Sequence, residues 1–478
     1  MPSPCQAAET TAVTDPTGRR HPAVVLLALA APVIATNISR TVMSFADFVM
    51  VSRLGTEAQA AIMPAGILLF CAIGFGMGLM SVVNTYVSQS LGRGRHAECS
   101  AYAWQGVILS IGLGVVTLPA IALVDPFFRL ADHGDAVAAM EVTYVRIGIF
   151  GIGPTVAAVA LSNFFIGVHR PAVGFFAALV SNVFNVAGNY ALIFGHWGLP
   201  PMGIAGAAWA TLAASILNVL ILLIWMLRPW YARTFHTRKT WRPSSRRIGR
   251  ILRIGFAPGV TFFFDIVSWA VFTIFLVGRF GTVQLAANNI CFKILEISFM
   301  PAVGMGMALT ASVGKSIGMQ RTDLARRYVR WGVAFAVGYM GLMGLVMALL
   351  RHELPGLLIA DGEPLRAEVI RWAAPMMLFC AVFQIFDALS ISYNGALRGA
   401  GDTTWTAVAW IASATLLMIG GGLLVSHLMP HWASTGLWGA ATAHVAAIGI
   451  AFALRYRYGP WERIDVFGGN SNQGEPRA

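Results

Sequence analysis

The sequence predicts an all-α membrane protein with twelve transmembrane helices in two six-helix lobes, related by a pseudo-two-fold axis along the membrane normal. The first observation is composition: 57% of the 478 residues are hydrophobic and 11% are charged, whereas a typical soluble domain is roughly a quarter charged. The second is the recurrence of apolar stretches of about 20 residues, long enough to cross a bilayer. The third is an internal repeat that divides the chain into halves.

Each apolar stretch is expected to be a helix, because bilayer hydrocarbon offers backbone amides no partner outside the helix itself. The twelve expected spans are 23–50, 60–88, 100–123, 141–166, 172–195, 203–227, 254–278, 285–314, 329–350, 372–396, 404–427 and 436–456. The first follows a polar stretch and is too long for a signal-peptide core, so we expect it to remain in the mature protein.

The basic residues gather on one side of the expected membrane. The formal net charge of +12 is compatible with nucleic-acid binding, but 22 of the 33 Lys and Arg residues fall in the two tails and in every second loop. By the positive-inside rule both termini are expected in the cytoplasm, and no nucleic-acid partner is expected. The loop 228–253 has nine basic residues and no acidic one. It is either a solvated loop that only sets topology or a segment that contacts anionic lipid headgroups.

The two halves are copies of one unit. A shift of 226 residues aligns VSRLGTEAQAA at 51–61 with VGRFGTVQLAA at 277–287, and the register continues to Tyr102 and Tyr328. Six helices per copy is an even number, so both copies have the same orientation. Parallel repeats of this kind place a substrate site near mid-membrane between two bundles that rock against each other. The expected units are a polar tail 1–21, a lobe 22–227, a basic linker 228–253, a lobe 254–458 and a polar tail 459–478.

Acidic residues inside the apolar spans form the candidate site for a coupling ion and a cationic substrate. An ionisable side chain at mid-bilayer costs at least about 2.5–3.5 kcal/mol and is a functional candidate by default. Asp265, Glu296 and Asp387 lie at similar expected depths in the seventh, eighth and tenth spans. Asp47 lies in the first span beyond Pro32, where a proline lets the helix bend. Neighbouring carboxyls in a low dielectric gain proton affinity, so a proton, Na⁺ and a cationic substrate can compete for them.

Structural pairing is the alternative role for these acids. Lys293 stands one turn before Glu296, and Arg40 stands two turns before Asp47 on roughly the same helix face. Either basic residue can neutralise its acidic neighbour, or backbone groups can bind the carboxyl.

Amides occupy the equivalent place in the first half. They are Asn163, Asn182, Asn185 and Asn189. Amides can ligate a cation or orient a substrate, although hydrogen bonds between helices are the favoured interpretation. The candidate contacts for substrate or ion are Asn185, Asn394, Gln384 and Phe264. The aromatic ring of Phe264 can stack on a flat cation. No catalytic residue, cofactor or metal site is expected, apart from Na⁺ at Asp387 and Asp265.

Taken together, these segments resemble the MATE (multidrug and toxic compound extrusion) family across nearly all of 22–458, and its NorM-like branch in particular. The segments that carry the resemblance are TVMSFADFVMVSRLG at 41–55, VSQSLGRGR at 87–95, VGKSIGMQR at 313–321, PGVTFFFDIVSW at 258–269 and FQIFDALSISYNGALRGAGDT at 383–403. The resemblance places Asp47 and Asp387 on membrane aspartates of the family. Asp265 stands at or beside the place of a usual Glu.

The sequence also departs from the family pattern. Arg40 stands where an uncharged residue is common, and the fifth span lacks the aspartate of DinF-like members. The second departure weighs against a coupling site in the amino-terminal lobe.

The resemblance implies a secondary active antiporter that exports cationic amphiphilic drugs or toxic compounds in exchange for H⁺ or Na⁺ by alternating access. It implies a monomer in the bacterial inner membrane, surrounded by lipid, with cationic small molecules as substrates and no cofactor. A flippase or exporter of a lipid-linked or metabolite substrate from the same superfamily is the alternative. An intramembrane enzyme is not expected, because the sequence has no HExxH motif and no clustered metal ligands.

Overall fold

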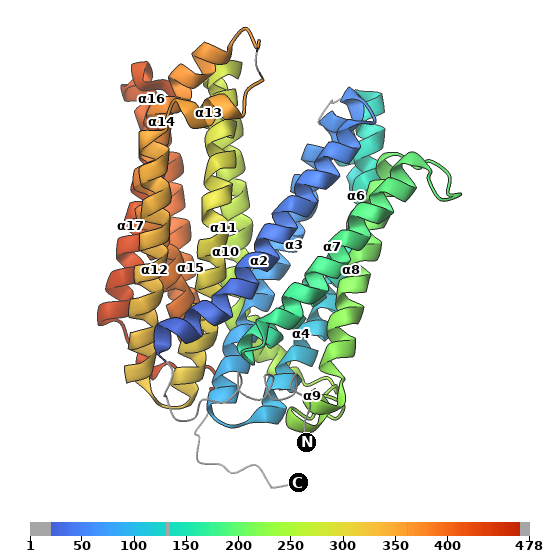
Figure 1. Ribbon diagram of the computed structural model, residues 1–478, viewed down its shortest axis with the longest axis vertical. Helices are drawn as coiled ribbons and strands as arrows, with labels where there is room; N and C mark the ends of the chain where they lie inside the picture. Colours follow the sequence, from blue (N-terminus) through green and yellow to red (C-terminus); the bar gives the residue numbers. More distant parts are fainter. Residues whose placement is uncertain (1–20, 131–133, 361, 469–478) are drawn as a thin grey trace.

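The computed structural model describes residues 21–130, 134–360 and 362–468, and within them it contains twelve helices long and apolar enough to span a membrane (Figure 1). In the amino-terminal half these are α2 (Pro22–Ser52), α3 (Thr56–Gly92), α4 with η1 and α5 (His96–Thr117, Leu118–Ala120, Ile121–Leu130), α6 (Asp135–Gly167), α7 (Pro171–Phe194) and α8 (Ile204–Met226). The described residues thus confirm the expected count of spans.

The carboxy-terminal half has the same organisation, with short helices between some spans. Its spans are α10 with η2 and η3 (Ser245–Val271, Phe272–Val277, Gly278–Phe280), α11 (Thr282–Gly318), α12 (Thr322–Leu349), α14 (Arg366–Ala400), α15 with η4 and α16 (Thr403–Ser413, Ala414–Gly420, Gly421–Leu428) and α17 (Ala433–Tyr458). The short elements are α9 (Pro229–Thr234), α13 (Glu353–Leu357), η5 (Pro430–Trp432) and η6 (Trp461–Arg463).

The internal repeat is visible in the helix boundaries. Both α3 and α11 are 37 residues long, and their bounds differ by the same 226 residues as the aligned sequence. Each begins after a glycine with positive φ, Gly55 at 122° and Gly281 at 96°, a backbone conformation that costs glycine little. Equivalent sequences therefore form equivalent helices in the two lobes.

The lobes meet along a seam between α3 on one side and α10, α11 and α14 on the other. A Cβ atom added to Gly92 would lie 2.9 Å from Gly318 Cα, and one added to Gly318 would lie 3.0 Å from Gly92 Cα. Because these glycines are repeat equivalents that contact each other, the pseudo-two-fold axis passes between them. Only residues without a side chain allow this approach.

Polar side chains of α3 bond the seam to the opposite lobe. Thr85 Oγ1 donates to the Arg398 carbonyl at 2.8 Å, and Gln89 Nε2 donates to the Gly399 carbonyl at 2.9 Å. Almost every residue of α3 from Gly78 to Ser90 is buried, whereas Met63, at the other end of α3, is 64% exposed. The ribbons of the lobes correspondingly diverge away from the end at which the described chain begins (Figure 1). The lobes are thus closed against each other on the side where the described chain begins, at residue 21.

Helix α2 connects the lobes. Its first half packs on the carboxy-terminal lobe, where Leu26 and Leu29 join a core with Leu309 of α11. Its last turn packs in the amino-terminal lobe, where Val51 joins a core with Ile193. The middle of α2 therefore lies where the chain passes from one lobe to the other (Figure 1).

The basic segment 228–253 differs from the expected loop. It contains α9 and the start of α10, which begins at Ser245, nine residues before the expected span. Trp104 Nε1 of α4 donates to the Thr237 carbonyl at 2.8 Å, and Ser100 Oγ donates to the Phe235 carbonyl at 2.6 Å. Part of this segment is thus packed against α4, because apolar side chains such as Phe235 interrupt the arginines and are buried.

The segment after α17, expected as the start of a polar tail, also packs on the protein as far as it is described. Phe467 is buried, lies edge-on to Tyr86 at 5.7 Å between ring centroids, and has the Arg93 guanidinium 4.2 Å from its centroid. On the other lobe, Arg326 pairs with Glu462 at 2.7 Å. This segment therefore contacts both lobes across the seam.

Phe467→Ala is expected to destabilise the folded protein by about 3 kcal/mol, the lower end of the usual cost of removing a buried Phe ring. The measurement is thermal unfolding of the purified protein in detergent. Phe275→Ala is the matched control, since that ring is 68% exposed. An equal midpoint for both variants would show that the terminal segment adds nothing to stability.

Candidate functional site

Two carboxyl groups lie within electrostatic range of each other inside the carboxy-terminal lobe. Asp387 of α14 is buried, Asp265 of α10 is half-buried, and the two are close enough to repel each other when both are charged. Trp269, one turn after Asp265 on α10, lies near its carboxyl. In the described protein, Asp387 Oδ2 and the buried Gln384 Oε1 one turn earlier accept no hydrogen bond. The site therefore offers acceptor oxygens that can bind a positive species.

Aromatic rings surround this acid pair. The Trp269 ring lies 4.9 Å from Phe292 and 6.2 Å from Phe383, between centroids. Trp438 of α17 is fully buried beside Phe292 and donates from Nε1 to Asn288 Oδ1 at 3.1 Å. Trp438 and Phe292 were not among the expected site residues, because an aromatic residue in an apolar span has no sequence signal that separates it from lipid-facing positions.

Glu296 does not join the acid pair through any contact among the described residues. Its carboxylate accepts from Lys293 Nζ at 2.9 Å, and both side chains are partly exposed. Glu296 is thus paired with Lys293, which is the structural alternative considered from the sequence. The structure brings together two of the three carboxyls expected at one level.

Asp47 lies in a second polar cluster, inside the amino-terminal lobe. It accepts a hydrogen bond from Asn189 Nδ2 of α7, and the same amide group lies 3.3 Å from Asn185 Oδ1. Asn185 Nδ2 in turn donates to Thr211 Oγ1 of α8 at 3.2 Å. Tyr144 of α6 is also within electrostatic range of the Asp47 carboxyl. One carboxyl is thereby linked to two other helices through a chain of amides.

The remaining expected amides bond between helices. Asn163 Nδ2 donates to the Met80 carbonyl of α3 at 3.3 Å, and Asn182 Nδ2 donates to Ser39 Oγ of α2 at 2.8 Å. These bonds fit the interpretation favoured from the sequence. Asn185 and Asn189 differ from them because their bonds lead to a carboxyl.

Arg40 is not the partner of Asp47. It is exposed, and no hydrogen bond or ion pair joins it to any residue that the structure describes. It lies on α2 directly after Ser39, whose Oγ accepts from Asn182 of α7.

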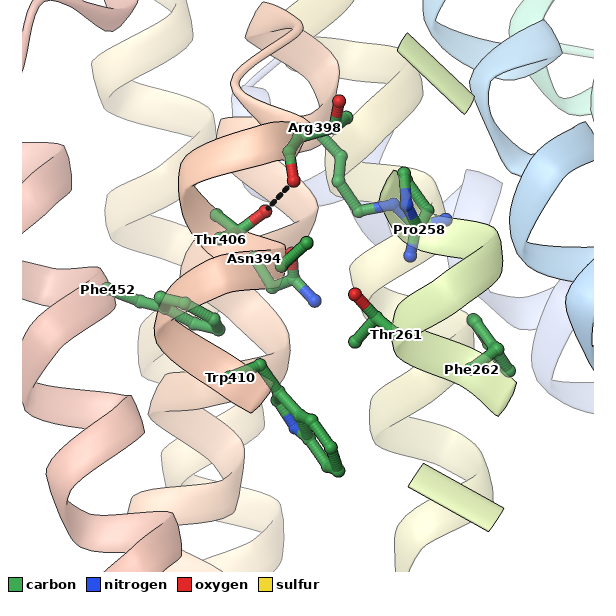
Figure 2. Close-up of a pocket in the computed structure, with 10 residues that line it drawn as sticks. Pro258, Thr261, Phe262, Asn394, Arg398, Thr406, Trp410 and Phe452 are labelled. Carbon is green, nitrogen blue, oxygen red and sulfur yellow. Dashed lines mark hydrogen bonds between the residues drawn. The ribbon is translucent and has the colours of Figure 1, made fainter. Parts of the chain in front are cut away.

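The candidate contact Asn394 lines a small cavity between α10, α14 and α15. Asn394 and Thr261 face each other across it, and Arg398 extends over it toward Pro258 (Figure 2). Its volume of about 30 Å³ holds roughly two water molecules, far below the several hundred Å³ of a drug site. The candidate Phe264 lies on α10 and is 40% exposed.

Comparison with known proteins identifies the family of this chain. The MatE family model matches residues 32–191 and 259–424, one segment in each lobe. The chain belongs to the MatE family. A relative from Rhizobium meliloti named "Probable multidrug resistance protein NorM" is 31% identical over 379 residues, which are 79% of this chain and 81% of the relative. One from Burkholderia vietnamiensis, "Multidrug resistance protein NorM", is 29% identical over 93% of this chain and 96% of its own length.

Solved structures share the MatE fold. A MOP superfamily transporter from Pyrococcus furiosus superposes with a TM-score of 0.84 at 18% identity, covering 93% of this chain and 98% of the other. A eukaryotic MATE transporter superposes with a TM-score of 0.79 at 18% identity, covering 92% and 96%. Members of the MatE family are membrane transporters that need no bound cofactor, so this chain is a multi-pass membrane protein and not an enzyme. Among the described residues, no group of three or more His, Cys, Asp or Glu is placed to hold a metal ion.

Proposed function

We propose that this protein is a secondary active antiporter that exports cationic amphiphilic drugs or toxic compounds in exchange for H⁺ or Na⁺. The observation that carries the proposal is the acid pair Asp265 and Asp387, held inside a lobe among aromatic rings. The names of the relatives, which describe multidrug resistance, support export of small molecules. Carboxyls in a low-dielectric interior bind positive species because an unneutralised charge there is costly.

Competition for the acid pair couples the two fluxes. When both carboxylates are charged they repel each other, so the empty site is the least stable state. A proton or Na⁺ neutralises the pair and displaces a bound organic cation, and the reverse exchange occurs on the other side of the membrane. A flat cation gains further from stacking on Trp269 or Phe383.

If the coupling ion is Na⁺, the site offers oxygen atoms that can bind it. Asp387 Oδ2 and Gln384 Oε1 lie one turn apart on α14 and are both without a donor among the described residues. Na⁺ is bound by carboxylate and amide oxygens, whereas a proton needs only the carboxylate. The acceptors therefore suit either ion, and a transport measurement must separate them.

Alternating access follows from the seam between the lobes. We propose that the termini are cytoplasmic, as the distribution of Lys and Arg indicates, in the inner membrane of a bacterium and as a monomer. The closed seam at Thr85 and Gln89 then faces the cytoplasm, so this conformation is open outward. Rocking of the lobes about the seam exposes the site to each side in turn. The Asp47 cluster gives the amino-terminal lobe its own carboxyl, whose protonation would change the bonds of α2 to α7.

Uptake of a fluorescent dye cation by proteoliposomes tests the antiport. A pH gradient or a Na⁺ gradient, imposed separately, is expected to drive the dye against its own gradient, and the effective one identifies the ion. A protonophore should abolish a proton-driven signal and leave a sodium-driven one. Dye movement that neither gradient accelerates would refute antiport by this protein.

A further inference from the structure

A guanidinium and a side-chain amide face the small cavity between α10, α14 and α15. They belong to Arg398 and Asn394, which both line the cavity and lie one turn apart on α14, where residues four apart are neighbours. Figure 2 shows Arg398 extending over the cavity toward Pro258 and the Asn394 amide nitrogen pointing toward Thr261. Neither side chain forms a hydrogen bond or ion pair with any other residue that the structure describes. Two sets of N–H donors thus converge on one cavity.

The threonine hydroxyls that line the same cavity already donate to the backbone. Thr261 Oγ1 donates to the Ala257 carbonyl at 2.9 Å, and Thr403 Oγ1 donates to the Ile254 carbonyl at 2.7 Å. Because each hydroxyl has a single hydrogen atom, these two groups have none left to donate into the cavity. The guanidinium and the amide are therefore the donors that remain.

In the described protein no carboxylate pairs with Arg398. The nearest acidic residue in the sequence, Asp402, is paired with Arg455 at 2.8 Å. Arg398 reaches α10 at Pro258 (Figure 2), and Asp265 of the acid pair is seven residues further along that helix, about 10 Å at 1.5 Å per residue. The positive charge at the cavity is therefore uncompensated by a direct contact.

An anion in the cavity would supply both the acceptor and the opposite charge. Arg398 and Asn394 are half-buried, and a guanidinium removed from water without an acceptor is costly. Hydrogen bonds from a charged donor are roughly twice as strong as those between neutral groups. Arg398 is two residues before the end of α14 at Ala400, so the cavity lies where the helix approaches water and a dissolved ion can reach it.

The size of the cavity selects a small ion. Its volume of about 30 Å³ has room for roughly two water molecules. A chloride ion is only slightly larger than a water molecule and accepts N–H groups from any direction. A phosphate or sulfate group carries a shell of oxygen atoms and needs more room, as does a lipid headgroup. Trp410 and Phe452 form apolar parts of the wall, which also suits an ion that is weakly hydrated.

We propose that Arg398 and Asn394 bind a chloride ion in the cavity between α10, α14 and α15. The ion neutralises the guanidinium and holds the last turns of α14 against the other two helices. This site is separate from the acid pair. It does not depend on the proposed export function, because binding to the purified protein is measured without transport.

Thermal unfolding of the full-length protein in detergent tests the binding. The midpoint is measured in sodium chloride and in sodium gluconate at equal ionic strength and pH, so that the Na⁺ concentration is constant and only the anion changes. Gluconate is too large for the cavity. Because a ligand that binds only the folded state stabilises it, the midpoint should rise by about 2 °C as chloride replaces gluconate and should then saturate.

Three variants assign the effect to this site. Arg398→Gln should lose the rise in chloride, since it removes the charge. Asn394→Asp places a carboxylate one turn before Arg398, where it serves as an internal counter-ion, so its midpoint in gluconate should match that of the wild type in chloride and should not rise further. This variant keeps the test intact if Arg398→Gln does not fold. Arg463→Gln, at an exposed arginine of η6, is the control and should keep the full rise.

Bromide locates the ion directly. It resembles chloride in size and charge and scatters X-rays anomalously, so a crystal of the protein grown in bromide should show an anomalous peak within hydrogen-bonding distance of the Arg398 guanidinium. Equal midpoints of the wild type in chloride and gluconate would overturn the proposal. A rise of wild-type size in Arg398→Gln or Asn394→Asp would also overturn it, as would bromide peaks that all lie away from this cavity.

Discussion

Asp387→Asn is expected to abolish gradient-driven export, with the initial rate of dye movement falling at least about a hundredfold. The amide is nearly the same size as the carboxyl, so the buried site keeps its packing, but it binds no proton at ordinary pH and holds no charge for a cation. Interactions of a full charge in a protein interior amount to several kcal/mol, and about 2.7 kcal/mol is already a hundredfold in rate. The measurement is the proteoliposome assay under the effective gradient.

Asp265→Asn should show the same loss, because it removes the other half of the pair. Asp323→Asn is the matched control: the same change on an exposed carboxyl at the start of α12, paired with Arg321 at 3.3 Å. The control should transport at the wild-type rate, and all three variants should elute and unfold as the wild type does. Export at the wild-type rate by both site variants would remove the acid pair from the mechanism.

Gly78→Ala is expected to reduce export about tenfold by preventing closure of the seam. A Cβ atom at Gly78 would collide with the carbonyl oxygen of Pro258 and lie 2.7 Å from Gly259 Cα. These are backbone atoms that cannot rotate away, so the lobes must separate locally. Overpacking of this kind costs about 1–3 kcal/mol, which shifts the equilibrium away from the closed seam.

A cysteine reporter measures that shift. Thr85 is buried at the seam, so Thr85→Cys in a background without native cysteines should react with a water-soluble maleimide only when the seam opens. Gly78→Ala should accelerate the reaction. Gly66→Ala on the same helix is the control, since a Cβ there meets nothing within 4 Å. Equal labelling and equal export for the two glycine variants would show that the contact of Gly78 with Pro258 and Gly259 is not needed to close the seam.

The carboxyls inside apolar spans and the repeat could be predicted because their signals are local in sequence. A carboxyl such as Asp387 within an apolar span is conspicuous by its cost, and the repeat at 226 residues appears again as the equal bounds of α3 and α11. The aromatic neighbours Trp438 and Phe292 could not be predicted. Trp438 stands beside Phe292 through the packing of α17 on α14 and η2, and nothing adjacent in the sequence marks it.

The sequence by itself determined twelve membrane helices, two parallel lobes and which carboxyls fall inside the apolar spans, because burial in lipid requires long apolar helices and makes each charge within them conspicuous. Tertiary structure alone decided which polar groups from different helices come together: Asn189 of α7 bonds Asp47, and Asp265 of α10 lies near Asp387. Pairing between helices depends on how each helix is rotated about its axis and crosses its neighbours. Those angles result from the packing of the whole bundle, and no single segment encodes them.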